Sequence, residues 1–142
     1  VYASQGFDPY ALLIDRMDAH GGWIASASDL LRFVGSIDGS PNRPQIINAG
    51  TRATMVTPSA ATGGGNYAKG WIVNSAGTYW HNGDLPGTAS IMIRGVNGWS
   101  IAFLTNSRPN TDTGIARVNA DLDQLGWDII RDIPDWPSTD LF

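Results

Sequence analysis

The stretch that decides the fold is "YWHNGDLPGTASIMIRGVNGWSIAFLTN", residues 79–106. Side chains alternate along residues 88–94, with one face carrying Ala89, Ile91 and Ile93 and the other Ser90, Met92 and Arg94. A period of two residues is typical of a β-strand. The pair Asn97-Gly98 then predicts a hairpin with a type I′ turn, after which residues 99–105 return as a second strand.

A second hairpin is predicted on the N-terminal side of this stretch. The segments "GWIVN" and "TYWHN" flank Ser75-Ala76-Gly77, which is a turn-forming sequence between two apolar runs. The predicted sheet is therefore an antiparallel meander. Both faces of its strands carry apolar residues, so we expect the sheet to be covered on both sides.

Three helices are predicted around the sheet. In "WIASASDLLRFVGSI", either Ser26 or Ser28 can serve as N-cap of a helix over residues 28–37. A short helix over 49–56 follows Asn48, and a longer one is indicated by apolar residues spaced three and four apart: Ile115, Val118, Leu122, Leu125 and Ile129. The order helix, helix, meander, helix predicts an α+β fold. We expect one domain over 1–142, with an irregular lead-in over 1–20 and a tail over 134–142.

Composition excludes several classes of function. The 142 residues are 42% apolar and 15% charged, as in globular proteins, and the formal charge of −4 gives no basic surface for nucleic acid. There is no cysteine, so disulfides and thiolate metal sites are excluded. No apolar run reaches the ~20 residues of a membrane span, and the first residues lack the features of a signal peptide.

His81 is the first candidate for chemistry. It ends an aromatic run and is followed by Asn82-Gly83, and a glycine allows another molecule to approach the backbone. Asp84 lies three residues further on and could orient the imidazole. A histidine that merely fills the rim of the core is the alternative. Of the six tryptophans, Trp80 is the one most expected to reach a cleft and stack on a ligand.

A nucleophile to accompany His81 is not evident in the sequence. No serine stands in a Gly-x-Ser-x-Gly turn, and none precedes a lysine by three residues, because Asn66 holds that place before Lys69, the single lysine. A serine without an activating base is a poor nucleophile. The two histidines are sixty-one residues apart in the chain and make a weak ligand set, so we predict neither a metal nor another cofactor.

Four segments in order resemble one family. "GGWIASASDLLRFV" resembles the Gly-Gly-Leu-x-Ser-Thr-Ala-x-Asp-Leu-x-x-Phe segment of serine β-lactamase-like proteins, which include class C β-lactamases, D-alanyl-D-alanine peptidases of the penicillin-binding type and esterases. "YAKGWIV" is similar to the family's Tyr-Gly-x-Gly-Trp strand. "WHNGDLPGTASIMIR" is similar to its His-x-Gly motif, and "SIAFLTN" to its closing strand.

The resemblance implies roles for residues 80–84. His81 matches the third-motif histidine or lysine, which lines the cleft and assists proton transfer or binds substrate charge. Asn82 and Gly83 complete that motif beside Trp80, and the backbone N–H of Asp84 matches an oxyanion-hole donor. The family's Ser-x-x-Lys nucleophile and its Tyr-x-Asn motif lie upstream of the Gly-Gly segment. "YAS" at Tyr2–Ser4 fits the latter in letters but stands too close to Gly21-Gly22.

The chain thus resembles the C-terminal portion of a β-lactamase/transpeptidase-like fold. Three functions are compatible with this resemblance. The chain could be part of a serine hydrolase acting on amides, lactams or esters and inactive by itself, a ligand- or partner-binding domain without catalysis, or an enzyme using His81 with Asp84. In the family, N-terminal strands lie beside the closing strand. We therefore expect residues 99–105 to associate with a segment carrying Ser-x-x-Lys or with a second copy. The family resemblance implies a periplasmic or secreted location.

Overall fold

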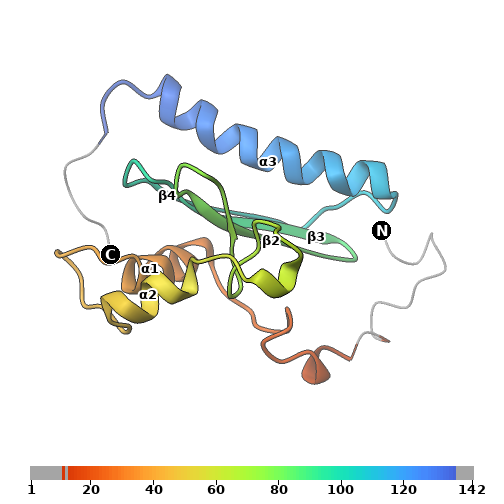
Figure 1. Ribbon diagram of the computed structural model, residues 1–142. Helices are drawn as coiled ribbons and strands as arrows, with labels where there is room; N and C mark the ends of the chain where they lie inside the picture. The colour runs from red at the N-terminus through yellow and green to blue at the C-terminus, as the bar shows by residue number, and fades with distance from the viewer. Residues whose placement is uncertain (1–10, 12, 137–142) are drawn as a thin grey trace.

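The computed structural model describes residues 11 and 13–136 of the chain. A four-stranded sheet lies between two helical layers, with α1 (Ala27–Ile37) and α2 (Ala49–Met55) on one face and α3 (Asp112–Asp132) on the other (Figure 1). The predicted α+β class and the covering of both sheet faces are confirmed. The expected lead-in over 1–20 and tail over 134–142 fall largely outside the described residues, as does Tyr2–Ser4.

The sheet is an antiparallel meander in the order β1 (Ile72–Val73), β2 (Tyr79–Leu85), β3 (Thr88–Arg94) and β4 (Ser100–Thr105). β2 and β3 join through Pro86-Gly87, and Gly87 adopts φ +82, which favours glycine. Within the described residues, no strand lies beyond β4. β1 pairs with β2 only at Tyr79 and Trp80, so the rest of β2 is also a sheet edge.

The turn between β3 and β4 does not have the predicted type I′ geometry. Gly95 N–H donates to the Trp99 carbonyl at 2.8 Å, which leaves the three-residue loop Val96–Gly98 between the strands. Only Gly98 of that loop has a positive φ, +98, whereas a type I′ turn also requires one at Asn97. The extra residue keeps Ile93 opposite Ile101, on the same face of the sheet; a two-residue turn would shift this register by one.

The helix starts follow the sequence signals. Ser26, rather than Ser28, caps α1: its hydroxyl accepts a hydrogen bond from Asp29 N–H, and the Asp29 carboxylate accepts one from Ser26 N–H. These bonds from Ser26 lower the pKa of Asp29 below 3.8, with Arg32 adding a smaller effect. Asn48 caps α2 in the same way, by accepting from Thr51 N–H at 2.8 Å.

Gly126 is the buried residue of α3 and faces Ile101 and Phe103 of β4. A Cβ added there would lie 2.9 Å from the end of the Ile101 side chain and 3.4 Å from Phe103, so a larger residue would require Ile101 to shift. Leu125, predicted to belong to the buried helix face, is 46% exposed. The reason is geometric: the adjacent Gly126 faces the sheet, and successive helical residues point about 100° apart.

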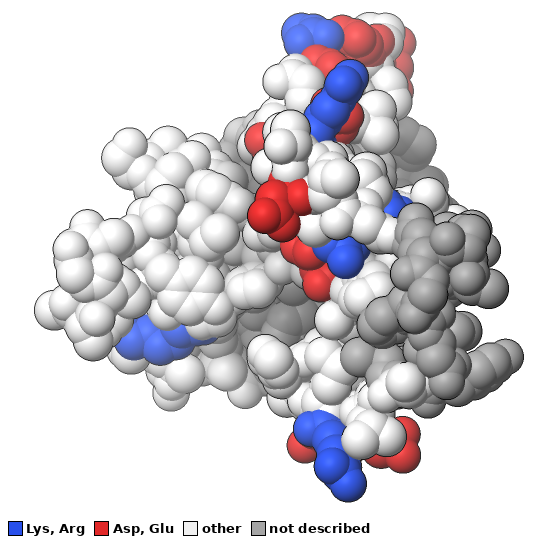
Figure 2. All heavy atoms as spheres, turned by 90° about the vertical axis from the view of Figure 1, so that its right-hand side faces the viewer, with Lys and Arg blue, Asp and Glu red and all other residues white. Residues whose placement is uncertain are grey.

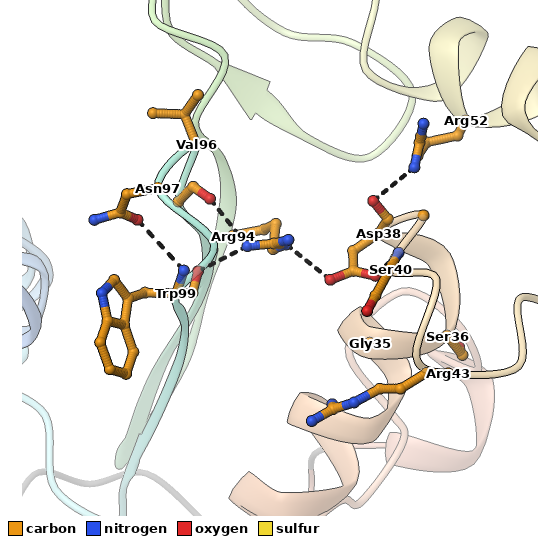
Figure 3. Close-up of polar contacts among 12 residues, drawn as sticks. Gly35, Ser36, Asp38, Ser40, Arg43, Arg52, Arg94, Val96, Asn97 and Trp99 are labelled. Atoms are coloured by element: carbon orange, nitrogen blue, oxygen red, sulfur yellow. Dashed lines mark hydrogen bonds and ion pairs between the residues drawn. The ribbon is translucent and has the colours of Figure 1, made fainter. Parts of the chain in front are cut away.

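The core lies under the β3–β4 turn end of the sheet. Val34 and Ile37 of α1 pack there with Trp71 and Tyr79. A polar clamp borders this core (Figure 3): Arg94 Nε lies 2.9 Å from Asp38 Oδ2, and its Nη1 donates to the carbonyl oxygens of Gly95 and Trp99. On the other side of Asp38, Arg52 donates to its carbonyl oxygen at 2.7 Å. The clamp joins α1, α2 and the turn.

Candidate functional site

Two adjoining hollows lie at the opposite end of the sheet, near the β2–β3 turn. The larger, of about 910 Å³, is bordered by the segment before α1 (residues 21–25), the end of β2 (83–85) and the end of β4 (104–106). The second, of about 620 Å³, includes Tyr67, Lys69 and His81. Both are lined by Gly83 and Ser90, which are cross-strand neighbours on β2 and β3.

His81 lies on the side of the sheet that faces these hollows. Side chains along β2 alternate between faces, and Tyr79, two residues before His81, packs in the core with α1. The exposed His81 ring meets Tyr67 edge to face, with ring centroids 5.9 Å apart. Its Nε2 is 3.1 Å from the Tyr67 hydroxyl oxygen, within hydrogen-bonding distance.

Asp84 does not orient His81. Its carboxylate Oδ1 is 3.0 Å from Arg108 Nη1, and the Arg108 side chain is largely buried. Asp84 is three residues from His81 on the same strand, so its side chain points to the opposite face. The pairing of His81 with Asp84 that the sequence allowed is therefore absent, and Tyr67 occupies the place beside the imidazole. This removes the support for an enzyme built on His81 with Asp84.

The backbone N–H of Asp84 points away from β3. Gly95 and Trp99 form a hydrogen-bonded pair, and such pairs alternate along antiparallel strands, so Ala89 bonds to β4 rather than to β2. Asp84 is paired with Ala89 in register, and its N–H is therefore directed to the open edge of β2. β1 ends opposite Trp80 and does not cover that part of the edge. A backbone donor so placed can bind an oxygen of a ligand.

Of the three other candidate residues, Gly83 and Asn82 border a hollow and Trp80 does not. Gly83 lines both hollows, and a Cβ there would lie 2.8 Å from the Ser90 hydroxyl oxygen, so glycine keeps this surface open. Asn82 borders the smaller hollow. Trp80 alternates with His81 on β2, and it lines neither hollow.

In the described part of the chain, no serine hydroxyl has a partner that could activate it as a nucleophile. Ser90 is the serine inside the hollows, and its hydroxyl donates weakly to the Gly83 carbonyl at 3.4 Å. Lys69 Nζ donates to the Thr57 carbonyl at 2.8 Å. Among residues 11 and 13–136, no serine forms a hydrogen bond to a lysine or histidine side chain, and the same residues hold no group of three metal-ligand side chains.

Apolar side chains stand exposed around the larger hollow. Ile24 is 97% exposed, Trp23 is 77% exposed, and Leu104 on the edge strand β4 is 46% exposed. On the side of the molecule with the β2–β3 turn, most of the visible surface of the described residues is uncharged, and several acidic and basic groups lie beside one another (Figure 2). Exposed apolar residues grouped around a hollow are typical of a binding surface.

The Beta-lactamase family model matches residues 2–125. This covers most of the 142 residues, and the chain therefore belongs to the Beta-lactamase family, with a serine hydrolase-like fold. No curated protein and no solved structure matches the chain. Within the described residues, no helix is both long and apolar enough to cross a membrane.

Proposed function

We propose that this member of the Beta-lactamase family supplies the substrate-binding part of a serine hydrolase that acts on amides, lactams or esters. Its contribution is the strand segment of His81, Asn82, Gly83 and the Asp84 N–H. The serine nucleophile comes from a Ser-x-x-Lys segment outside these 142 residues, and the chain by itself is inactive. The observation that carries this proposal is the hollow beside β2, which has a directed backbone donor and an exposed imidazole; among the described residues, no serine there is bonded to a lysine or histidine.

The proposed reaction is acyl transfer in two steps. The serine oxygen bonds to the substrate carbonyl carbon, and the carbonyl oxygen takes up negative charge, to which the Asp84 N–H donates. Collapse breaks the bond to the amine or alcohol, which takes up the proton that the serine has lost. Water then attacks the acyl-serine, releases the acid and restores the serine. Removing one oxyanion donor from such a site costs about 10²–10³ in rate.

The apolar rim supports completion by another segment. Trp23, Ile24 and Leu104 expose apolar surface around the hollow, and within the described residues no strand pairs with the outer side of β4. Unpaired edge strands invite pairing with another chain. A segment placed there would cover the rim, and the nucleophile that it carries would have to reach the open edge of β2, to which the Asp84 N–H is directed. Self-association through β4 (residues 99–105 in the sequence) is the competing use of that edge.

The test is complementation. This chain is mixed with a separately produced segment that carries Ser-x-x-Lys and is encoded next to this sequence, and hydrolysis of a nitrophenyl ester and of a chromogenic cephalosporin is measured. We expect turnover from the mixture and none from either part. The matched control is a segment with Ser→Ala in Ser-x-x-Lys.

The outcomes separate the proposals. Stable complex formation without turnover would overturn the catalytic proposal and leave a binding domain of the same fold. Light scattering tests whether the chain associates through β4. A monodisperse monomer in every mixture, with β4 amides protected from hydrogen exchange, would contradict association through that edge.

A further inference from the structure

We propose that Tyr67 is a positioning residue for His81: its hydroxyl donates a hydrogen bond to Nε2 and holds the neutral imidazole as the Nδ1–H tautomer. The inference deepens the proposed function, on which its importance for activity rests. The hydrogen bond can be tested without measuring catalysis, because it is a single contact of 3.1 Å between two side chains of the smaller hollow.

The direction of the bond follows from the two partners. A tyrosine hydroxyl carries its proton at neutral pH and can donate or accept, whereas a neutral imidazole has one donor and one acceptor nitrogen. Where Nε2 accepts from the hydroxyl, the ring proton must be on Nδ1. The hydrogen bond at one nitrogen of a histidine thus decides the state of the other. A free imidazole side chain prefers the Nε2–H form, so the proposed state requires a specific donor.

Tyr67 is held in place by its backbone although its side chain is exposed. Its carbonyl oxygen accepts from Ser59 N–H at 3.2 Å. The residues beside it are fixed as well, because Ala68 N–H donates to the Trp71 carbonyl at 2.7 Å and Lys69 N–H to the Met55 carbonyl at 3.1 Å. His81 lies within the β2–β3 ladder, opposite Met92. Both partners are therefore attached to fixed backbone, which lowers the entropic cost of keeping the bond.

Two consequences follow for the chemistry of His81. In the neutral state Nε2 is engaged by Tyr67, so His81 offers a donor, Nδ1–H, rather than a free base. When the ring takes up a proton, Nε2–H can donate to the same tyrosine oxygen, so the ring keeps its place in both states. The other ionisable groups lining this hollow are Lys69, whose amine donates to the Thr57 carbonyl, and His20.

The test is the tautomer of His81, read from ring ¹⁵N chemical shifts and nitrogen–carbon-bound proton correlations of the ¹⁵N-histidine-labelled chain above neutral pH. We expect the Nδ1–H pattern for His81 in the wild type and its loss in Tyr67→Phe, which keeps the ring but lacks the donor. Tyr79→Phe is the matched control, because Tyr79 lies in the core and has no described contact with His81. His20 is the internal reference, and His20→Gln assigns the signals.

The results decide the inference without reference to turnover. An Nε2–H pattern for His81 in the wild type, or a tautomer that Tyr67→Phe leaves unchanged in a folded chain, would overturn it. Circular dichroism and the thermal midpoint establish that the variant is folded. A failed complementation with a clear Nδ1–H signal would overturn the proposed function and leave the positioning bond in place.

Discussion

The two ends of the sheet differ on the face that α1 and α2 share. At the β3–β4 turn, Arg94 and Asp38 form an ion pair in which the side chains are 17% and 8% exposed, and a packed core adjoins it. At the β2–β3 turn, the same face carries His81, Gly83 and the exposed Leu104 around open hollows. One strand, β2, runs from the first environment into the second within seven residues.

The comparison indicates where stability and function are located. The end at the β3–β4 turn, called the closed end, holds a packed core and a largely buried ion pair, so substitutions there should change the free energy of unfolding. The end at the β2–β3 turn, called the open end, exposes apolar side chains and a directed backbone N–H, which contribute little to folding of the isolated chain. Substitutions there should change binding or turnover instead. The following variants test this division in order of decreasing expected effect.

Arg94→Met should give the largest loss of stability. It leaves the Asp38 carboxylate largely buried without its partner, and breaking a buried ion pair from one side costs about 3–5 kcal/mol. Urea denaturation measures the change. The control is Arg117→Met, which removes the exposed Arg117–Asp121 pair, where Arg117 is 81% exposed, and should cost at most about 0.5 kcal/mol. Equal losses for the two variants would remove the distinction between closed and open surface.

The double variant Arg94→Met/Asp38→Leu tests whether the loss of stability comes from the unpaired Asp38 carboxylate. It removes both charges, so its loss of stability should be smaller than that of Arg94→Met alone. A double variant less stable than the single one would show that the contacts of Arg94 with the turn carbonyls, rather than the ion pair, hold this end together.

His81→Ala should leave folding intact and act on turnover. The imidazole is exposed and has one hydrogen bond, so we expect a change below about 0.5 kcal/mol in unfolding free energy. In the complemented hydrolase, loss of a hydrogen-bond donor in the cleft should lower kcat about 10²-fold. His20→Ala, at the other histidine of the same hollow, is the control and should retain most of the activity. A large stability loss with unchanged kcat would place His81 in the core instead.

Ser26→Ala tests the start of α1, which borders the open end. Loss of the N-cap should cost about 1 kcal/mol at neutral pH. The pKa of Asp29 is lowered in the folded chain, so its contribution to stability is present above its unfolded value of 3.8 and is lost as the pH falls through the lower folded value. The difference between wild type and Ser26→Ala should therefore shrink on acidification. A difference that grows at acidic pH would contradict the capping bonds.

Tyr79→Phe should have the smallest effect at neutral pH. The buried Tyr79 hydroxyl has no hydrogen-bond partner in the described structure, so its removal should be neutral or stabilising by up to about 1 kcal/mol. Burial raises the pKa of Tyr79 above 10.0, so the folded state holds this proton more tightly and wild-type stability should fall as the pH rises past that value. In urea titrations, Tyr79→Phe should lose less stability than the wild type at alkaline pH. An equal loss in both would contradict the raised pKa of Tyr79.

Local patterns predicted the elements because each depends on neighbouring residues. The alternation in 88–94 and the capping serine before α1 are such cases, and both elements form. The type I′ turn was wrong because the pairing of Ile93 with Ile101 requires a three-residue loop, and this pairing is set across strands rather than within Asn97-Gly98.

The site was predictable only in part. The resemblance nominated His81 and the Asp84 N–H, and alternation along β2 sets the face of each. Their partners could not be read from the sequence, because Tyr67 is fourteen residues from His81 and Arg108 is twenty-four from Asp84. Both contacts depend on how the segment before β1 and the loop after β4 fold back onto the sheet.

The most direct test of the central claim is the intact mass of the purified chain after exposure to a fluorophosphonate and to a penicillin. The claim is that the open end binds substrate but holds no activated nucleophile. We predict no adduct on the folded chain alone, and an adduct on the Ser-x-x-Lys serine when that segment is added. A covalent adduct on a serine of the chain itself, such as Ser90, would contradict the account.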